Sequence, residues 1–206
     1  MKKEELFAII HGYICSDGGI YNRTVKDIHG KKLRIRRKLR TKFFNETPEL
    51  INDFIDIIRK LYPNVKSIRY YPKRKEVEIR NHTLSKDILN LGKVWSYNWE
   101  FPKYMNTKQK LLWIRAFVDS DGTVQNRMYD RFIAIDSVNK RGLKDISKFL
   151  IDINIPNKIY NIKGGSFRLK ISKRNNLIRF NSLITLKHPE KQHKLIEAIN
   201  SYKRIE

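Results

Sequence analysis

Hydrophobic residues in the first 15 positions recur at helical spacing, and Gly18-Gly19 ends that pattern, which predicts a helix over residues 3–15. Alternating segments at 20–28 and 32–43 flank His29-Gly30 and are typical of a β-hairpin. An amphipathic stretch opens at Pro48 and closes at Pro63, which predicts a second helix. Strands at 65–71 and 76–81 and a short helix at 83–91 complete this half.

The second half repeats this order with a helix at 107–119, strands at 123–129 and 131–137, a helix at 139–152, strands at 157–162 and 166–172, and a helix at 174–184. One additional helix is expected at 188–203. We therefore expect an α+β fold made of a duplicated αββαββα module, with pseudo-symmetric halves at 1–100 and 101–206. The junction, residues 93–106, is too rich in aromatic residues for a free linker, so the halves are expected to pack together.

The strand around residues 33–43 separates two kinds of side chain. Its even positions are all cationic, and its odd positions are mostly apolar. The cations are Arg34, Arg36, Lys38, Arg40 and Lys42. A fainter copy has Ser166, Arg168 and Lys170 alternating with Phe167, Leu169 and Ile171. A two-stranded ribbon fits the DNA major groove, where Arg and Lys reach guanine edges; a solvated outer face is the alternative.

The charge of the chain favours a polyanionic partner. Its 206 residues include 44 Lys and Arg against 21 Asp and Glu, a net charge of +23. Nucleic acid is the first expectation, a membrane surface is a weaker one, and a lysine coat from biased coding explains part of the excess. Because Cys15 is the only cysteine and no signal or membrane-spanning segment is recognisable, we expect a cytoplasmic or nucleoid-associated protein.

Two predicted helices end in the same way, in ICSDGGI at residues 14–20 and VDSDGTV at residues 118–124. Asp17 and Asp121 lie where the helix dipole disfavours a carboxylate. An Asp-Gly turn explains one copy but not two at matched positions. Small residues four apart would let the two helices pack closely and bring the carboxylates together; these are Gly12, Ser16, Ala116 and Ser120. Paired carboxylates favour a divalent metal such as Mg²⁺.

The segments Ile10–Gly18 (IHGYICSDG) and Ile114–Gly122 (IRAFVDSDG) resemble the two motifs of a LAGLIDADG homing endonuclease of the monomeric two-repeat type. The resemblance covers essentially the whole chain. It implies site-specific double-strand DNA cleavage at a long target, as in intron homing, with Mg²⁺ or Mn²⁺. It also implies that Asp17 and Asp121 are catalytic metal ligands, with Gly18 and Gly122 beside them, and that Lys42 assists catalysis.

In that family, saddle-shaped antiparallel sheets bind DNA, and no membrane is involved. The residues that this role would fall on are Tyr21, Arg23, Arg34, Arg36, Lys38, Arg40, Gln125, Arg127, Ser166, Arg168 and Lys170. Some members act as maturases, so intron RNA is an alternative partner, and a non-cleaving nucleic-acid-binding protein is an alternative function. The chain departs from the motif at Cys15, and we expect Asp136-Ser137, without a lysine, at the place that matches Thr41-Lys42.

Overall fold

The structure, a computed structural model, describes residues 1–29 and 32–202; within the first hairpin, the side chains of residues 23, 25–29 and 32–37 are not described. The first half contains α1 (Lys3–Asp17), β1 (Gly18–His29), β2 (Lys32–Phe44), α2 (Pro48–Leu61), β3 (Ile68–Tyr71), the 3₁₀ turn η1 (Pro72–Arg74), β4 (Glu76–Ile79) and α3 (His82–Leu91).

The second half contains α4 (Thr107–Asp121), β5 (Gly122–Arg127), β6 (Asp130–Ser137), α5 (Lys140–Asp152), β7 (Lys158–Asn161), the 3₁₀ turn η2 (Lys163–Gly165), β8 (Phe167–Ser172), α6 (Arg174–Leu183) and α7 (Pro189–Asn200). Each half has one antiparallel four-stranded sheet, in the order β1-β2-β4-β3 and β5-β6-β8-β7. The predicted α+β class and the duplicated order of elements are therefore confirmed. The division at residue 100 stays a prediction.

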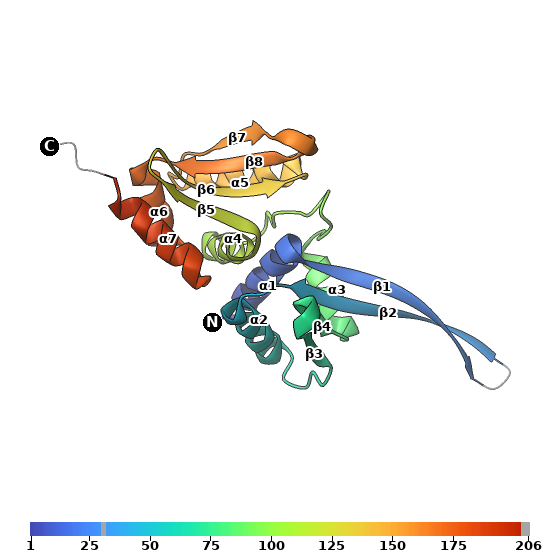
Figure 1. The fold of residues 1–206 in the computed structure, drawn as a ribbon. Coiled ribbons are helices and arrows are strands. Elements are labelled where there is room, and N and C mark those ends of the chain that lie inside the picture. The colour runs from blue at the N-terminus through green and yellow to red at the C-terminus, as the bar shows by residue number, and fades with distance from the viewer. Residues whose placement is uncertain (30–31, 203–206) are drawn as a thin grey trace.

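Figure 1 shows α1 and α4 side by side where the two halves meet. Both helices continue two residues beyond the predicted ends, so that Asp17 and Asp121 are their last residues. Asn106 and Gln109 form a capping box at the start of α4, with both hydrogen bonds at 3.0 Å. The remaining differences from the predicted bounds are small: β3 begins at Ile68, and the β5–β6 turn lies at residues 128–129.

The β1–β2 hairpin continues far beyond its sheet. β2 pairs with β4 only from Thr41 to Phe44, whereas it pairs with β1 from Lys32 to Phe43. The remainder is a two-stranded ribbon that projects from the body (Figure 1). The odd positions of β2 whose side chains are described fit the inward face that the alternation indicated: Thr41 and Phe43 are buried and Leu39 is half-buried. The outer odd positions, 33–37, lie outside the described side chains, so the prediction stays untested there.

One hydrophobic core runs through both halves. Tyr13, Phe43 and Phe54 pack in the first half, and Trp113 stacks on Phe117 with ring centroids 5.1 Å apart in the second. The junction contributes Trp99 and Phe101, both buried, so this segment is part of the core as expected. Within residues 1–29 and 32–202, no helix has the length and apolar character needed to cross a membrane.

Candidate active site and nucleic-acid surface

The two motif helices approach each other closely at Gly12. A Cβ atom added there would lie 2.5 Å from the Trp113 carbonyl oxygen and 3.1 Å from the Ala116 Cβ, so only glycine fits. Ser16 turns its hydroxyl back on its own helix and donates to the Gly12 oxygen at 3.0 Å. The Ser120 hydroxyl is buried and has no hydrogen-bond partner within the described part of the chain. Gly12 and Ala116 thus meet between the two helices, while the predicted interface roles of Ser16 and Ser120 stay predictions.

Asp17 and Asp121 end α1 and α4 on the same side of the helix pair. Burial raises the pKa of Asp17, while the Asn45 amide, which donates to its Oδ2 at 3.1 Å, acts in the opposite direction. Asp121 is open to solvent on one side, but the surrounding protein still desolvates it and raises its pKa to about 7. The Asp17 and Asp136 carboxylates raise the pKa of Asp121 further. The two motif carboxylates are therefore electrostatically coupled.

The two glycines that follow the aspartates are required by close approach. A Cβ atom on Gly18 would lie 2.7 Å from the Ile14 Cα, and one on Gly122 would lie 2.7 Å from the Val118 oxygen. Neither glycine has a positive φ. Each lets a strand leave directly from the helix end, which keeps the aspartate at the junction of helix and sheet. Their predicted role beside a metal stays a prediction.

A cavity adjoins each aspartate, and each cavity is lined by both motif helices. Asp17 lines one of about 470 Å³ together with Ser120, while Asp121 lines one of about 400 Å³ together with Ser16. This crossed arrangement is what a pseudo-two-fold axis between α1 and α4 produces. The two cavities differ in charge. The first contains two carboxylates, Asp17 and Glu46, together with Arg74, Lys75 and Lys191. The second contains two carboxylates, Asp121 and Asp136, and no Lys or Arg among its described lining residues.

The residues around the helix ends suit a hard divalent cation. The donors there are carboxylate, amide and hydroxyl oxygens from Asp17, Asp121, Asn45 and Ser120, and such oxygens are the ligands that Mg²⁺ prefers. No group of three or more His, Cys, Asp or Glu residues in the described chain is arranged to hold a metal by protein ligands alone. A site with two carboxylates therefore leaves room for water and phosphate oxygens, as Mg²⁺ sites commonly do.

Lys42 lies at the end of β2 near the aspartates, opposite Gly19 in the strand register. Its ammonium is 2.6 Å from Glu76 Oε1 and 3.7 Å from Glu78 Oε2, and both glutamates are buried. Arg40 also binds Glu78, at 3.1 Å. Burial favours a raised pKa for Glu78, but hydrogen bonds from Arg80 and Arg40 outweigh it and leave that pKa lowered. The inner end of the predicted cation row is thus neutralised by β4, which the alternating pattern of β2 alone did not reveal.

The second sheet is neutralised in the same way. Arg168 binds Asp136 through two hydrogen bonds of 2.7 Å, and Lys170 is 2.6 Å from Asp130. Ser166 and Gln125 are half-buried and Arg127 is exposed.

The strand register also corrects the predicted match to Lys42. Because Gly18 pairs with Phe43 and Gly122 pairs with Ile135, the counterpart of Lys42 is Ala134, and Asp136 corresponds to Phe44.

The first hairpin carries far more positive charge in its sequence than its counterpart in the second half. Residues 18–44 contain ten Lys and Arg and one Asp, a net charge of +9, whereas residues 122–137 contain two Arg and two Asp and are neutral. Pairing across the ribbon sets Tyr21 opposite Arg40, Arg23 opposite Lys38, and Val25 opposite Arg36. Tyr21 and Lys38 are exposed. The side chains of Arg23, Arg34 and Arg36 lie outside the described set, so their predicted DNA contacts remain predictions.

Three further residues organise this centre, and the motifs did not indicate their roles. Asn45 holds Asp17, and Lys191 reaches the end of α4 from α7. Asp119 is fully buried and accepts hydrogen bonds from the backbone amides of Lys187 and His188 at 2.8 and 3.0 Å. Asp119 thereby fixes the segment that precedes α7 and carries Lys191. Of these three residues, only Asp119 lies within a motif, as the first aspartate of VDSDG.

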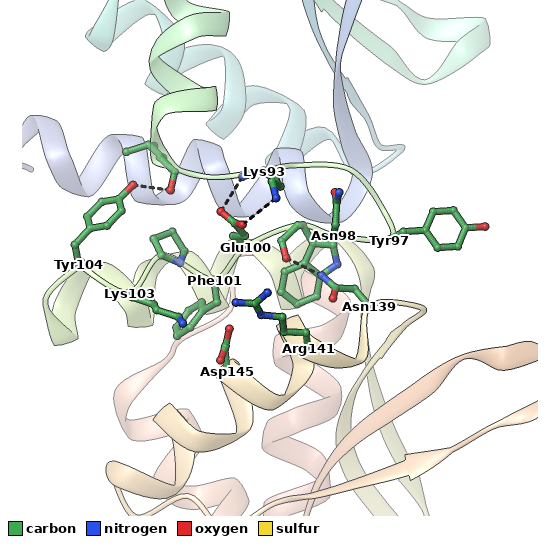
Figure 2. A pocket seen from close by; sticks show the side chains of 13 residues that line it. Lys93, Tyr97, Asn98, Glu100, Phe101, Lys103, Tyr104, Asn139, Arg141 and Asp145 are labelled. Carbon is green, nitrogen blue, oxygen red and sulfur yellow. Dashed lines mark hydrogen bonds and ion pairs between the residues drawn. The ribbon is translucent and has the colours of Figure 1, made fainter.

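A third cavity, of about 380 Å³, lies between the junction and α5 and contains neither motif aspartate. Figure 2 shows Glu100 facing Lys93, and Arg141 and Asp145 at the rim from α5. The Glu100 carboxylate accepts from the Lys93 amide at 3.4 Å, and Asn139 donates to the Trp99 oxygen at 2.6 Å. The first contact closes the junction on itself, and the second fastens it to the second half.

Comparison with known proteins adds four findings. Residues 108–185 match the family model described as a LAGLIDADG-like domain. A crystal structure of I-DmoI in complex with DNA and Mn is similar over 89% of this chain and 97% of that chain, with a TM-score of 0.66 and 21% identity. A structure of full-length DUF199/WhiA from Thermatoga maritima is similar over 100% of this chain and 63% of that chain, with a TM-score of 0.64 and 16% identity. No curated protein matches the sequence.

Proposed function

Because the chain carries a LAGLIDADG-like domain and has the two-repeat LAGLIDADG fold, we propose that it is a site-specific, metal-dependent double-strand DNA endonuclease. The observation that carries the proposal is the pairing of Asp17 and Asp121 at the ends of two tightly packed helices. A protein that only binds nucleic acid gains nothing from two coupled carboxylates beside its binding surface, because they repel phosphate.

Each part of the site has a defined task in this proposal. Asp17 and Asp121 hold Mg²⁺ or Mn²⁺, and Asn45 orients Asp17. A bound divalent ion supplies Lewis-acid stabilisation of the charge that develops on the phosphodiester oxygens. The cations beside Asp17, which include Arg74, Lys75 and Lys191, attract the phosphate that lies there. Lys42 stands at the strand end next to this cavity and contributes positive charge near the reacting phosphate.

The ribbon and the two sheet faces supply the DNA surface. The β1–β2 hairpin has a net charge of +9, whereas the β5–β6 hairpin is neutral. Most of the counterions released when DNA binds should therefore come from the DNA that contacts the first half. Double-stranded DNA is the partner that the related structure with DNA suggests, and no observation favours intron RNA. A single chain contains both aspartates, so the proposed active form is a monomer.

The test is a cleavage selection. The protein is incubated with Mg²⁺ and a library of long duplex sites, and the ends produced are sequenced. We expect cuts within one defined sequence, and we expect Asp17→Asn and Asp121→Asn each to abolish or nearly abolish them. Specific binding without any cleavage by the unaltered protein would instead identify a non-cleaving DNA-binding protein. Full cleavage by either variant would exclude that aspartate as a metal ligand.

A further inference from the structure

The side chain of Lys191 ends at the centre of the molecule, where the two halves meet. Its ammonium donates three hydrogen bonds to the last carbonyl groups of α4, to Val118 at 3.0 Å, Asp119 at 2.7 Å and Ser120 at 2.8 Å. The Val118 oxygen also accepts the Gly122 amide, whereas the Asp119 and Ser120 carbonyls belong to the last turn, where helical amide partners are missing. All three ammonium protons are thereby used, and the charge is fixed at the negative end of the α4 dipole.

Three aspartates lie within electrostatic reach of this ammonium. Asp17, Asp119 and Asp121 each act to raise the pKa of Lys191, against the effect of its burial. Asp119 has other partners, since it accepts the amides of Lys187 and His188 and lies 3.7 Å from the Arg115 guanidinium. Among the described residues, Lys191 is the cation that lowers the pKa of both Asp17 and Asp121.

The described part of the first half shows no counterpart to this arrangement. The segment after α3 approaches α1 at the position that matches Asp119, where Cys15 donates to the Lys93 oxygen at 3.8 Å. At the end of α1, the nearest side-chain donor is the Ser16 hydroxyl, which bonds within its own helix. Among the residues that the structure describes, no Lys or Arg side chain donates to the last carbonyls of α1. In the described structure, the lysine that caps a motif helix is therefore found at the end of α4 and not at the matching end of α1.

We propose that Lys191 is a positioning residue for the aspartate pair, a resident cation that relieves the repulsion between Asp17 and Asp121 when no metal is bound. Two like charges at adjacent helix ends repel, and a fixed ammonium beside both offsets that repulsion. A second consequence rests on the proposed function: because part of the repulsion is already offset, a divalent ion adds less stability than it would without Lys191.

A double-mutant cycle in EDTA separates charge relief from helix capping. Lys191→Gln removes the charge and keeps a hydrogen-bond donor, while Lys194→Met, which breaks an exposed ion pair with Glu190 on the same helix, is the matched control. We expect Lys191→Gln to lower the melting temperature by about 3–6 °C in the unaltered protein and by less than half of that in Asp121→Asn. Lys191→Arg should restore most of the loss. Equal losses in both backgrounds would mean that Lys191 only caps α4 and would overturn the proposal.

The second measurement adds Mg²⁺ to the same proteins without DNA. A bound ion stabilises the folded state more the more tightly it binds, as RT ln(1 + c/Kd) with c the Mg²⁺ concentration, so the rise in melting temperature should be larger in Lys191→Gln than in the unaltered protein. If no protein responds to Mg²⁺ while the cycle still shows coupling, Lys191 relieves the aspartates but the proposed metal site is wrong. If Mg²⁺ stabilises Lys191→Gln and the unaltered protein equally, and the cycle shows no coupling, the role of Lys191 is overturned and the metal site stands.

Discussion

Trp113 of α4 donates its indole Nε1–H to His11 Nδ1 of α1 at 2.8 Å, across the interface between the two halves. Because Nδ1 accepts, the remaining proton of a neutral His11 is on Nε2, which faces the Gly92 oxygen at 3.4 Å. Burial lowers the pKa of His11 to about 4, so the ring is neutral at physiological pH. One buried polar residue therefore ties the helix pair to the start of the junction and fixes how the two aspartates face each other.

Gly12 lies beside this contact, and we expect the packing of α1 against α4 to tolerate no side chain at this position. Gly12→Ala would press its Cβ against the Trp113 carbonyl oxygen, and Gly12→Leu would force α1 and α4 apart. Overpacking of this kind costs about 1–3 kcal/mol, and a shift of about 1 Å between catalytic groups can cost about a hundredfold in rate. Cleavage rate and melting temperature should both fall, and Leu should be worse than Ala.

Gly19 is the matched control for this prediction. An added Cβ there would meet only the Tyr21 side chain, at 3.1 Å, and that ring is exposed and can move. Gly19→Ala should therefore retain nearly normal stability. A Gly12→Leu protein that folds and cleaves normally would show that the close helix pair is not what positions the aspartates.

The long ribbon predicts an asymmetric DNA target. Nine strand pairs, from Tyr21–Arg40 to His29–Lys32, lie beyond the part of β2 that pairs with β4, whereas two pairs of the β5–β6 hairpin lie beyond β8. At about 3.3 Å per residue the first ribbon reaches about 23 Å further, or about seven base pairs at about 3.4 Å each. The protected half-site on that side should be longer by about this amount in a hydroxyl-radical footprint.

Shortening the ribbon tests this reach. Replacing residues 24–37 by Asn-Gly joins the Arg23–Lys38 pair with a two-residue turn and removes six cations. The longer half-site should contract, and the slope of log K against log salt should become shallower by up to about 5. Lys144→Gln with Lys148→Gln, two exposed cations on α5, is the control and should leave footprint and slope nearly unchanged. A symmetric footprint for the unaltered protein would contradict the prediction.

Lys42 should affect cleavage more than binding. It stands opposite Gly19, next to the strand start that follows Asp17. Lys42→Met should lower the single-turnover rate by about tenfold or more while affinity stays within a few-fold, because charge near the reacting phosphate acts mainly on the transition state. Stability must be measured as well, since the change leaves Glu76 buried without its 2.6 Å partner.

Lys170→Met is the control for this lysine. It breaks a comparable 2.6 Å ion pair, with Asp130, on the second sheet. It should weaken binding without a specific loss of rate. If Lys42→Met reduces affinity and rate by the same factor, Lys42 is one more phosphate contact and has no special place in the chemistry.

The sequence predicted what depends on local pattern. Helical spacing placed α1 and α4, period-two alternation placed β2, and small residues at Gly12 and Ala116 indicated close packing. It did not predict contacts made between distant segments. Nothing local to β2 shows that Glu76 and Glu78 neutralise its inner cations, and nothing in α7 shows that Lys191 reaches α4. The predicted match of Thr41-Lys42 to Asp136-Ser137 failed for the same reason, because strand register is set by pairing partners.

The pH dependence of stability offers a last, independent test of the aspartate pair. The pKa of Asp121 is about 7 in the folded protein and close to its ordinary value of 3.8 when unfolded, so the folded state holds this proton more tightly. Between about pH 4 and 7 the group therefore lowers the free energy of unfolding as pH rises, and its cost is fully present above pH 7. Asn does not titrate. In EDTA, Asp121→Asn should be at least as stable as the unaltered protein, and its advantage in melting temperature should widen from about pH 5 to about pH 8.

The comparison isolates Asp121 because His11, which titrates in the opposite sense, is present in both proteins. Asp152→Asn is the matched control, because Asp152 is also the last residue of a helix but is exposed and outside the aspartate pair. Asp152 experiences the unfavourable helix-dipole effect, about 0.3–1 kcal/mol, but has no neighbouring motif carboxylate. The gain in melting temperature of Asp121→Asn could stay constant with pH or equal that of Asp152→Asn. Either result would mean that Asp121 destabilises the protein only because it lies at a helix end. A loss of stability at pH 8 would make both motif aspartates structural caps, and the case for a metal centre between the two halves would fail.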